Sequence, residues 1–454
     1  MGKIFITFYF SFLTFNFFGQ TVNQKLQKAF TTFENDSQLK HAISSLYVID
    51  ATTGQVVFDK NSQIGLAPAS TQKIITSVTA FELLGKDYRY KTEVRGDNNA
   101  TIIVGGGDPS LGSWRFDKDG HKFFSAIITA FREKNRPLGE LKLIDRSDKL
   151  WPDGWIYQDI GNYYGASAYE LNWGENQFDI TFIPGQPGDP AAIDTVVTDS
   201  RFWNGTANGV KTGPKGSGDN AYIYIEGHDY IIQGTVPAGV KSFTISGANH
   251  YPQYSLATAY YKFCDLNNIA VVKPGNISLR SYYPNALVQK ADIIYTHYSP
   301  KLDSIIYWFN KKSINLYGEA LIKTVGYEKK GFGSTDSGVV VVKKFWKEKG
   351  MDENELNIVD GSGLSPLNRV TTHAQVEILK YAKTKDWFPY FFTSLPEYNG
   401  MKIKSGTIRG VKGFCGYHKA KSGKEYIFSF LVNNYSGASS TLVNKMYKVM
   451  DILK

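Results

Sequence analysis

The chain has 454 residues, a net charge of +9 and 42% hydrophobic residues, which is ordinary for a globular protein of two or three domains. Its lysines come in pairs and never in a long run, and no nucleic-acid-binding motif is present, so the composition gives no support to nucleic-acid binding. The 29 tyrosines, 29 phenylalanines and 43 glycines favour much β-structure and many turns.

Residues 1–20 have the pattern of an export signal. Lys3 is followed by about fifteen mostly apolar residues and then by Gly19. A bilayer-spanning helix needs about 20 apolar residues, so a cleaved signal is favoured over a permanent anchor. We therefore expect an exported protein, periplasmic or associated with the cell wall, with at most peripheral membrane contact.

The sequence pattern of the following elements differs between the ends and the middle of the chain. Helical spacing dominates near both ends, and short strands with turns dominate the middle. In chain order we expect a helix at 23–40, strands at 45–50 and 55–59, a helix at 70–84, strands at 91–94 and 101–104, a helix at 121–134, a strand at 141–145, strands and turns over 176–250, helices at 254–267, 299–309, 315–325, 336–349 and 372–384, strands at 411–420 and 425–432, and a helix at 439–453.

This order predicts an α/β protein, more strictly α+β, in which strands near both ends of the chain form one sheet. The expected division is a signal at 1–20, a discontinuous domain of 21–90 and 286–454, and a β-rich insert at 91–285 with an inner subdomain near 176–250. The seven histidines are too scattered for metal-ligand spacing, so we expect no metal and no cofactor. Cys264 and Cys415 could form a disulfide or remain two buried thiols.

A Ser-x-x-Lys segment begins the predicted helix at 70–84. Ser70 and Lys73 are three residues apart, so they share a helix face and the amine can reach the hydroxyl. Lysine can act as a base for serine if burial or a nearby cation lowers the lysine pKa. Taken alone, the segment is better explained by a helix cap and a solvated lysine, and a second copy occurs at 37–40.

Two later segments suit the same site. Ser313 and Asn315 form a Ser-x-Asn before an apolar helix, where they can pass a proton and hold a carbonyl, or simply cap the helix. Lys404, Ser405, Gly406 and Thr407 form an edge-strand pattern with a small residue and groups that bind a carboxylate. Two similar tripeptides are set aside: 211–213 as a loop of the insert, and 421–423 as a hairpin tip.

The order Ser-x-x-Lys, Ser-x-Asn, Lys-Thr/Ser-Gly resembles the penicillin-recognising serine enzymes. Roughly 240 residues separate Ser70 from Ser313, far more than in class A β-lactamases. This spacing is similar to that of the D-alanyl-D-alanine carboxypeptidase/endopeptidase family, the class C low-molecular-mass penicillin-binding proteins, which carry a nested insert there. Further phrases similar to that family occur at 106–109, 154–155, 164–166, 360–365 and 416–417.

The resemblance implies a β-lactamase-like transpeptidase domain, an antiparallel sheet flanked by helices, with a β-rich insert. It implies that Ser70 is acylated, Lys73 is its base, Ser313 relays a proton and Asn315 holds the substrate peptide. By the same resemblance, Lys404 lowers the pKa of Lys73, Ser405 and Thr407 bind the substrate carboxylate, and the N–H groups of Ser70 and Thr407 form an oxyanion hole. Asp159 and Tyr164 would line a pocket for the free end of a diaminopimelate side chain.

The expected function is therefore a serine D-Ala-D-Ala carboxypeptidase or endopeptidase that acts on peptidoglycan stem peptides and is acylated by β-lactam antibiotics. Ala168 stands where β-lactamase spacing would require a deacylating glutamate, so slow hydrolysis of a penicillin adduct is expected. Two alternatives remain at this stage: a β-lactamase or esterase on the same fold, and a non-catalytic peptidoglycan-binding protein. The sequence does not indicate an oligomeric state.

Overall fold

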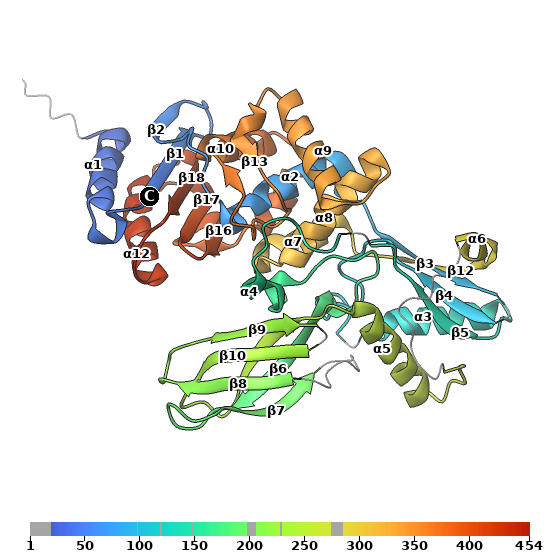
Figure 1. Ribbon diagram of the computed structural model, residues 1–454. Helices are drawn as coiled ribbons and strands as arrows, with labels where there is room; N and C mark the ends of the chain where they lie inside the picture. The colour runs from blue at the N-terminus through green and yellow to red at the C-terminus, as the bar shows by residue number, and fades with distance from the viewer. Residues whose placement is uncertain are drawn as a thin grey trace, which may run out of the picture.

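The computed structural model describes residues 20–97, 99–118, 120–147, 149–197, 206–227, 229–273 and 285–454, without the side chains of 285–287. The predicted export signal thus lies outside the described residues, apart from Gln20. The described chain has two parts: helices packed around a sheet, built from both ends of the sequence, and an insert formed mainly of strands (Figure 1).

The largest sheet in the described part of the chain has the order β15-β16-β17-β18-β1-β2, with every neighbouring pair antiparallel. Its register is continuous along β1 and β18, from Ile43 opposite Asn433 to Asp50 opposite Tyr426. The prediction that strands near both ends of the chain share one sheet is confirmed. The strands are β1 (Ile43–Asp50), β2 (Val56–Lys60), β15 (Glu397–Tyr398), β16 (Met401–Ile408), β17 (Val411–Lys419) and β18 (Glu425–Asn433).

Both faces of this sheet are covered. Successive side chains of a strand point to opposite faces. In β1, Leu46 and Val48 belong to an apolar cluster with α1 (Val22–Glu34) and α12 (Ser439–Met450), whereas Tyr47 and Ile49 belong to a second cluster on the other face. The second face is covered by a larger group of helices, which includes α2 (Lys73–Leu84), the helix that follows Ser70.

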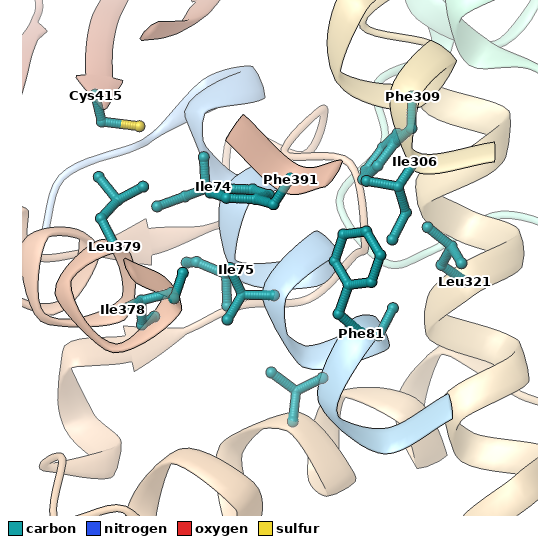
Figure 2. Close-up of a cluster of buried hydrophobic side chains, with 14 of the residues drawn as sticks. Ile74, Ile75, Phe81, Ile306, Phe309, Leu321, Ile378, Leu379, Phe391 and Cys415 are labelled. Carbon is teal, nitrogen blue, oxygen red and sulfur yellow. The ribbon is translucent and has the colours of Figure 1, made fainter. Parts of the chain in front are cut away.

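Residues 73–81 of helix α2 are all buried. Figure 2 shows Ile74, Ile75 and Phe81 of this helix among apolar side chains from several other elements. A helix that is apolar around its whole circumference belongs in a core. Its surroundings fix the start of α2, and therefore Lys73, in one position. The neighbours are α7 (Leu302–Lys312), α8 (Asn315–Lys330), α9 (Thr335–Glu348), α10 (Thr372–Lys383), α11 (Phe388–Ser394) and the short pair β13 (Leu356–Asn357) and β14 (Arg369–Val370).

The insert contains smaller sheets. One has the order β12-β3-β4-β5 and packs with α3 (Lys122–Glu133) and α5 (Pro252–Leu266). Two three-stranded sheets, β8-β10-β9 and β11-β6-β7, enclose a separate apolar cluster. The bounds are β3 (Lys91–Gly96), β4 (Ala100–Val104), β5 (Glu140–Ile144), β6 (Gln177–Ile183), β7 (Ala192–Val197), β8 (Thr206–Gly213), β9 (Asn220–Glu226), β10 (Asp229–Pro237), β11 (Phe243–Ala248), β12 (Asp292–Tyr298), α4 (Tyr157–Ile160) and α6 (Asn285–Lys290).

One sequence-based expectation needs correction here. The tripeptide 211–213 lies in strand β8 and not in a loop, because its backbone pairs with β10 in parallel register, Lys211 opposite Thr235. Strand β12 follows the expected domain boundary at 286, yet it pairs with β3, Tyr298 opposite Lys91. The chain therefore leaves the insert through a strand of the insert's own sheet.

The structure also decides between the two interpretations of the cysteines. Cys264 and Cys415 are both free and buried, so they are two thiols rather than a disulfide. Among the described residues, no helix has the length and apolar character to cross a bilayer. Within the same ranges, no group of three or more His, Cys, Asp or Glu side chains is arranged to hold a metal ion.

Candidate active site

Ser70 lies in a single 3₁₀ turn, Ala69–Gln72, and Lys73 is the first residue of α2. The sequence placed both residues in the first turn of one helix; the turn is there, but it is wound more tightly. Ala69 has a φ of 46°, in the left-handed region that residues other than glycine seldom adopt. Such strain is typical of positions that the surrounding structure over-determines, and here it immediately precedes the half-buried Ser70.

The Lys73 amine is enclosed. Its Nζ lies 2.9 Å from Ser70 Oγ, 2.6 Å from Asn315 Oδ1 and 2.7 Å from the carbonyl oxygen of Ser362. Burial lowers the Lys73 pKa well below its ordinary value, and the nearby charge of Lys404 lowers it further, against the opposing carboxylates of Asp360 and Glu319. A buried amine with a lowered pKa can be neutral and accept a proton from the serine hydroxyl.

Ser313 and Asn315 occupy the sharp junction between α7 and α8. Ser313 ends α7 with a φ of 58°, and Asn315 is the first residue of α8. The N-cap position of α8 is taken by Ile314, which makes no side-chain cap bond, so the alternative explanation of Ser313 or Asn315 as the N-cap of this helix is wrong. The junction directs Asn315 Oδ1 to Lys73, while Asn315 Nδ2 donates to the carbonyl of Tyr164, 2.8 Å away.

Strand β16 forms the third side of the site. Lys404 Nζ donates to Ser313 Oγ at 3.0 Å and to the carbonyl of Ser405 at 2.7 Å. Lys404 is buried, and this burial lowers its pKa to about 7. Three segments far apart in sequence are therefore joined by hydrogen bonds: Lys73 contacts Ser70 and Asn315, and Lys404 contacts Ser313.

Gly406 allows this strand to approach the serine turn. A Cβ placed on Gly406 would lie 2.6 Å from the Pro68 carbonyl oxygen and 2.9 Å from the Ser70 backbone nitrogen, closer than real Cβ contacts. Only glycine permits such an approach of two backbones. The strand consequently brings the half-buried Ser405 and the exposed Thr407 to the two sides of the point nearest Ser70.

A buried aspartate, Asp360, supports the site although the sequence gave it no role. Its carboxylate accepts hydrogen bonds from the backbone N–H groups of Gly363 at 2.8 Å and Ser365 at 2.7 Å. Gln72 Nε2 donates to the same carboxylate at 3.0 Å. These bonds fix the turn in which the Ser362 carbonyl faces Lys73. In the sequence, 360–365 stood out only as a phrase similar to the family, and it did not indicate what this segment contacts.

The two residues predicted to line a side-chain pocket, Asp159 and Tyr164, lie in the insert. Asp159 is on α4, where burial raises its pKa to about 6. Tyr164 lies in the next turn, 163–165, and its pKa is raised, chiefly by burial and also by the charge of Asp159. The structure joins Tyr164 to the site through its backbone carbonyl, which accepts from Asn315, and it places Asp159 near Tyr164.

Comparison with known proteins shows the family of the chain. A model of the D-Ala-D-Ala carboxypeptidase 3 (S13) family matches residues 26–452. The chain belongs to this family. It is 28% identical over 449 residues to a D-alanyl-D-alanine carboxypeptidase of Actinomadura sp. (strain R39), covering 90% of this chain and 81% of that protein.

The S13 chain also resembles solved structures along nearly its whole length. The crystal structure of penicillin binding protein 4 (dacB) from Haemophilus influenzae aligns with a TM-score of 0.75 at 18% identity, covering 94% of this chain and 98% of that one. The same protein complexed with a β-lactam aligns with a TM-score of 0.70 at 16% identity, covering 95% of this chain and 99% of that one. The predicted family and the predicted fold class are confirmed.

Proposed function

We propose that this protein is an exported serine D-Ala-D-Ala peptidase that cleaves peptidoglycan stem peptides through an acyl-enzyme on Ser70. The observation that supports it most is the contact of the buried Lys73 amine with Ser70 Oγ at 2.9 Å, in a chain that belongs to the D-Ala-D-Ala carboxypeptidase 3 family. Family membership supports the reaction class, and the geometry supports the assignment of residues to its steps.

The first half-reaction transfers the acyl group to the enzyme. Neutral Lys73 accepts the Ser70 proton as Ser70 Oγ attacks the carbonyl carbon of the penultimate D-alanine. The N–H groups of Ser70 and Thr407 stabilise the oxyanion of the tetrahedral intermediate. The proton then passes by way of Ser313 to the nitrogen of the terminal D-alanine, the peptide bond breaks, and D-alanine leaves.

Water completes the reaction by hydrolysing the Ser70 ester. The stem peptide leaves with a new carboxyl group, and Ser70 regains its proton. Asn315 holds the substrate backbone, and Ser405 and Thr407 bind the carboxylate of the terminal residue.

We further propose that Asp159 and Tyr164 bind the amino-acid end of a diaminopimelate side chain. A separate proposal concerns the domain division: residues 292–298 belong structurally with the insert, because β12 pairs with β3.

β-Lactams would acylate the same serine. The ring amide takes the place of the peptide bond, but its leaving nitrogen stays attached after the ring opens, so the adduct persists until water attacks. Ala168 provides no carboxylate at the position expected for a β-lactamase glutamate, which favours slow release. The protein is therefore proposed to be inhibited by penicillin rather than to confer resistance.

The test combines labelling and product analysis. A fluorescent penicillin is expected to label the purified protein in a 1:1 ratio and to leave Ser70→Ala unlabelled. Mass spectrometry of muropeptides after digestion should show loss of terminal D-alanine, opening of cross-links, or both. Equal labelling of Ser70→Ala, or labelling without any change in the muropeptides, would contradict the proposal. Rapid nitrocefin turnover would instead indicate a β-lactamase.

A further inference from the structure

Lys412 lies beside the candidate site, on the strand next to the one that carries Lys404. It occupies β17 directly opposite Thr407 of β16. Its Nζ donates to Thr407 Oγ1 at 2.7 Å and lies 5.0 Å from the centre of the Phe414 ring. The side chain is thus held half-buried between an aromatic ring and a hydroxyl, and its ammonium points toward the proposed carboxylate-binding residue.

Lys404 and Lys412 lie close to each other without an acidic side chain to balance their charge in the described part of the chain. Within the described chain, neither Lys404 nor Lys412 forms an ion pair, whereas other lysines of the same strands do: Lys402 pairs with Glu397 and Lys419 with Glu425. Burial lowers the pKa of Lys412, and the charge of Lys412 in turn lowers the pKa of Lys404. A partly buried charge that has no partner is costly, so this arrangement favours binding of an anion.

The hydrogen-bond direction at Thr407 indicates where the anion sits. A threonine hydroxyl donates one hydrogen bond and accepts others. Because its oxygen accepts from the Lys412 ammonium, which has no acceptor capacity, the Thr407 proton must be directed to another acceptor. Thr407 is exposed and lies next to Gly406, which abuts the Ser70 turn. A carboxylate at this place would accept a hydrogen bond from Thr407 and would be attracted by the positive charges of Lys404 and Lys412.

We propose that Lys412 is a specificity-determining residue that recognises the free C-terminal carboxylate of the substrate, together with Thr407 and Lys404. The inference rests on the proposed function and adds to it a cation from the neighbouring strand. Its consequence is selectivity: Lys412 favours peptides that end in a carboxylate over the same peptides ending in a neutral amide, because only the carboxylate supplies the missing negative charge.

The experiment compares one acyl-D-Ala-D-Ala peptide with its C-terminal carboxamide. Lys412→Met removes the charge and keeps an unbranched apolar side chain. We expect it to lower kcat/KM about tenfold for the carboxylate peptide, equivalent to about 1.4 kcal/mol, and to change that of the carboxamide less than about twofold. Lys412→Arg should retain most of the preference, since it keeps the charge. Lys419→Met on the same strand makes the same change in net charge and should leave both values unaltered.

A binding measurement keeps the test independent of turnover. In a Ser70→Ala background, calorimetry with both peptides should show the same loss, confined to the carboxylate, when Lys412→Met is added. Equal losses for the two peptides, or no loss for either, would overturn the assignment of Lys412. The proposed function fails differently: wild-type protein would then release no D-alanine and take up no penicillin, whatever residue stands at 412.

Discussion

The two sides of the candidate site are anchored in different parts of the molecule. Lys73 and Lys404 come from α2 and β16, which are packed in the core built from both ends of the chain. Asn315 begins a helix of that core, but its amide donates to the carbonyl of Tyr164 in the insert. The core therefore fixes the groups that we propose carry out the chemistry, and the insert helps to fix the group that we propose holds the substrate.

A buried glutamate of the insert strengthens this second attachment. Glu175 Oε1 accepts from Tyr317 Oη of α8 at 2.8 Å and from Arg115 Nε at 2.9 Å. The Arg115 guanidinium also lies 5.2 Å from the ring centre of Trp308 in α7. The insert thus contacts both helices that flank Ser313. Hydrogen bonds to a buried charge are sensitive to the loss of one partner, so this attachment can be tested by single substitutions.

The largest effect is expected in the core. Lys73→Met removes the proposed base while keeping an apolar side chain of similar length. Because general-base catalysis contributes about 10²–10⁴-fold, kcat for D-alanine release should fall by about 10³-fold. Stopped assays of released D-alanine would measure this. A variant that retains wild-type kcat would show that another group takes the Ser70 proton.

The next effect concerns the approach of β16 to the serine turn. Gly406→Val places a branched side chain where a Cβ alone would lie 2.6 Å from the Pro68 carbonyl oxygen. The strand must move away, and displacement of catalytic groups by about 1 Å can cost about 10²-fold in rate. The acylation rate with penicillin should fall by this order. Gly410→Val serves as a comparison for lost stability alone, because a Cβ there meets no other atom but the φ of 71° strains any side chain.

A smaller effect is expected where the insert meets α8. Tyr317→Phe removes one of the hydrogen bonds to Glu175, so the free energy of unfolding should decrease by about 1–3 kcal/mol. Denaturant titration measures this change. Tyr88→Phe is the matched control, because the hydrogen bond from half-buried Tyr88 to Glu328 of the same helix is exposed to solvent, and its loss should cost about 1 kcal/mol or less. Equal losses in the two variants would contradict a special role for the buried contact.

The smallest effect is a pH dependence of kcat/KM that we attribute to Lys404, a residue of the core strand β16. Lys404 has a pKa of about 7, so it is cationic below that pH and neutral above it. Because kcat/KM reports the free enzyme, its value for a carboxylate-ended peptide should fall as the pH rises through about 7. The carboxamide peptide should show a smaller alkaline decline, because it lacks the carboxylate, while the effect of the Lys404 charge on the Lys73 pKa is common to both peptides. Identical profiles for the two peptides would exclude Lys404 from binding the carboxylate.

Local patterns in the sequence were enough for much of the fold. The apolar spacing after Lys73 predicted α2, and alternating residues near both ends predicted the strands of the shared sheet. The ordered motifs selected Ser70, Lys73, Ser313, Asn315 and Lys404. In the structure Lys73 contacts Ser70 and Asn315, and Lys404 contacts Ser313, so hydrogen bonds connect the three segments. These features could be predicted because helix periodicity and motif spacing are properties of short segments.

Other features depended on which segments meet. Nothing near Asp360 in sequence indicates that it fixes a turn facing Lys73, and nothing near Glu175 indicates a contact with Tyr317. Lys412 looks like any strand lysine until its cross-strand partner, Thr407, is known. The sequence by itself thus determined the chemical groups and the elements that carry them. The tertiary structure decided their partners, because burial and hydrogen bonding between distant segments set the charge and direction of each group.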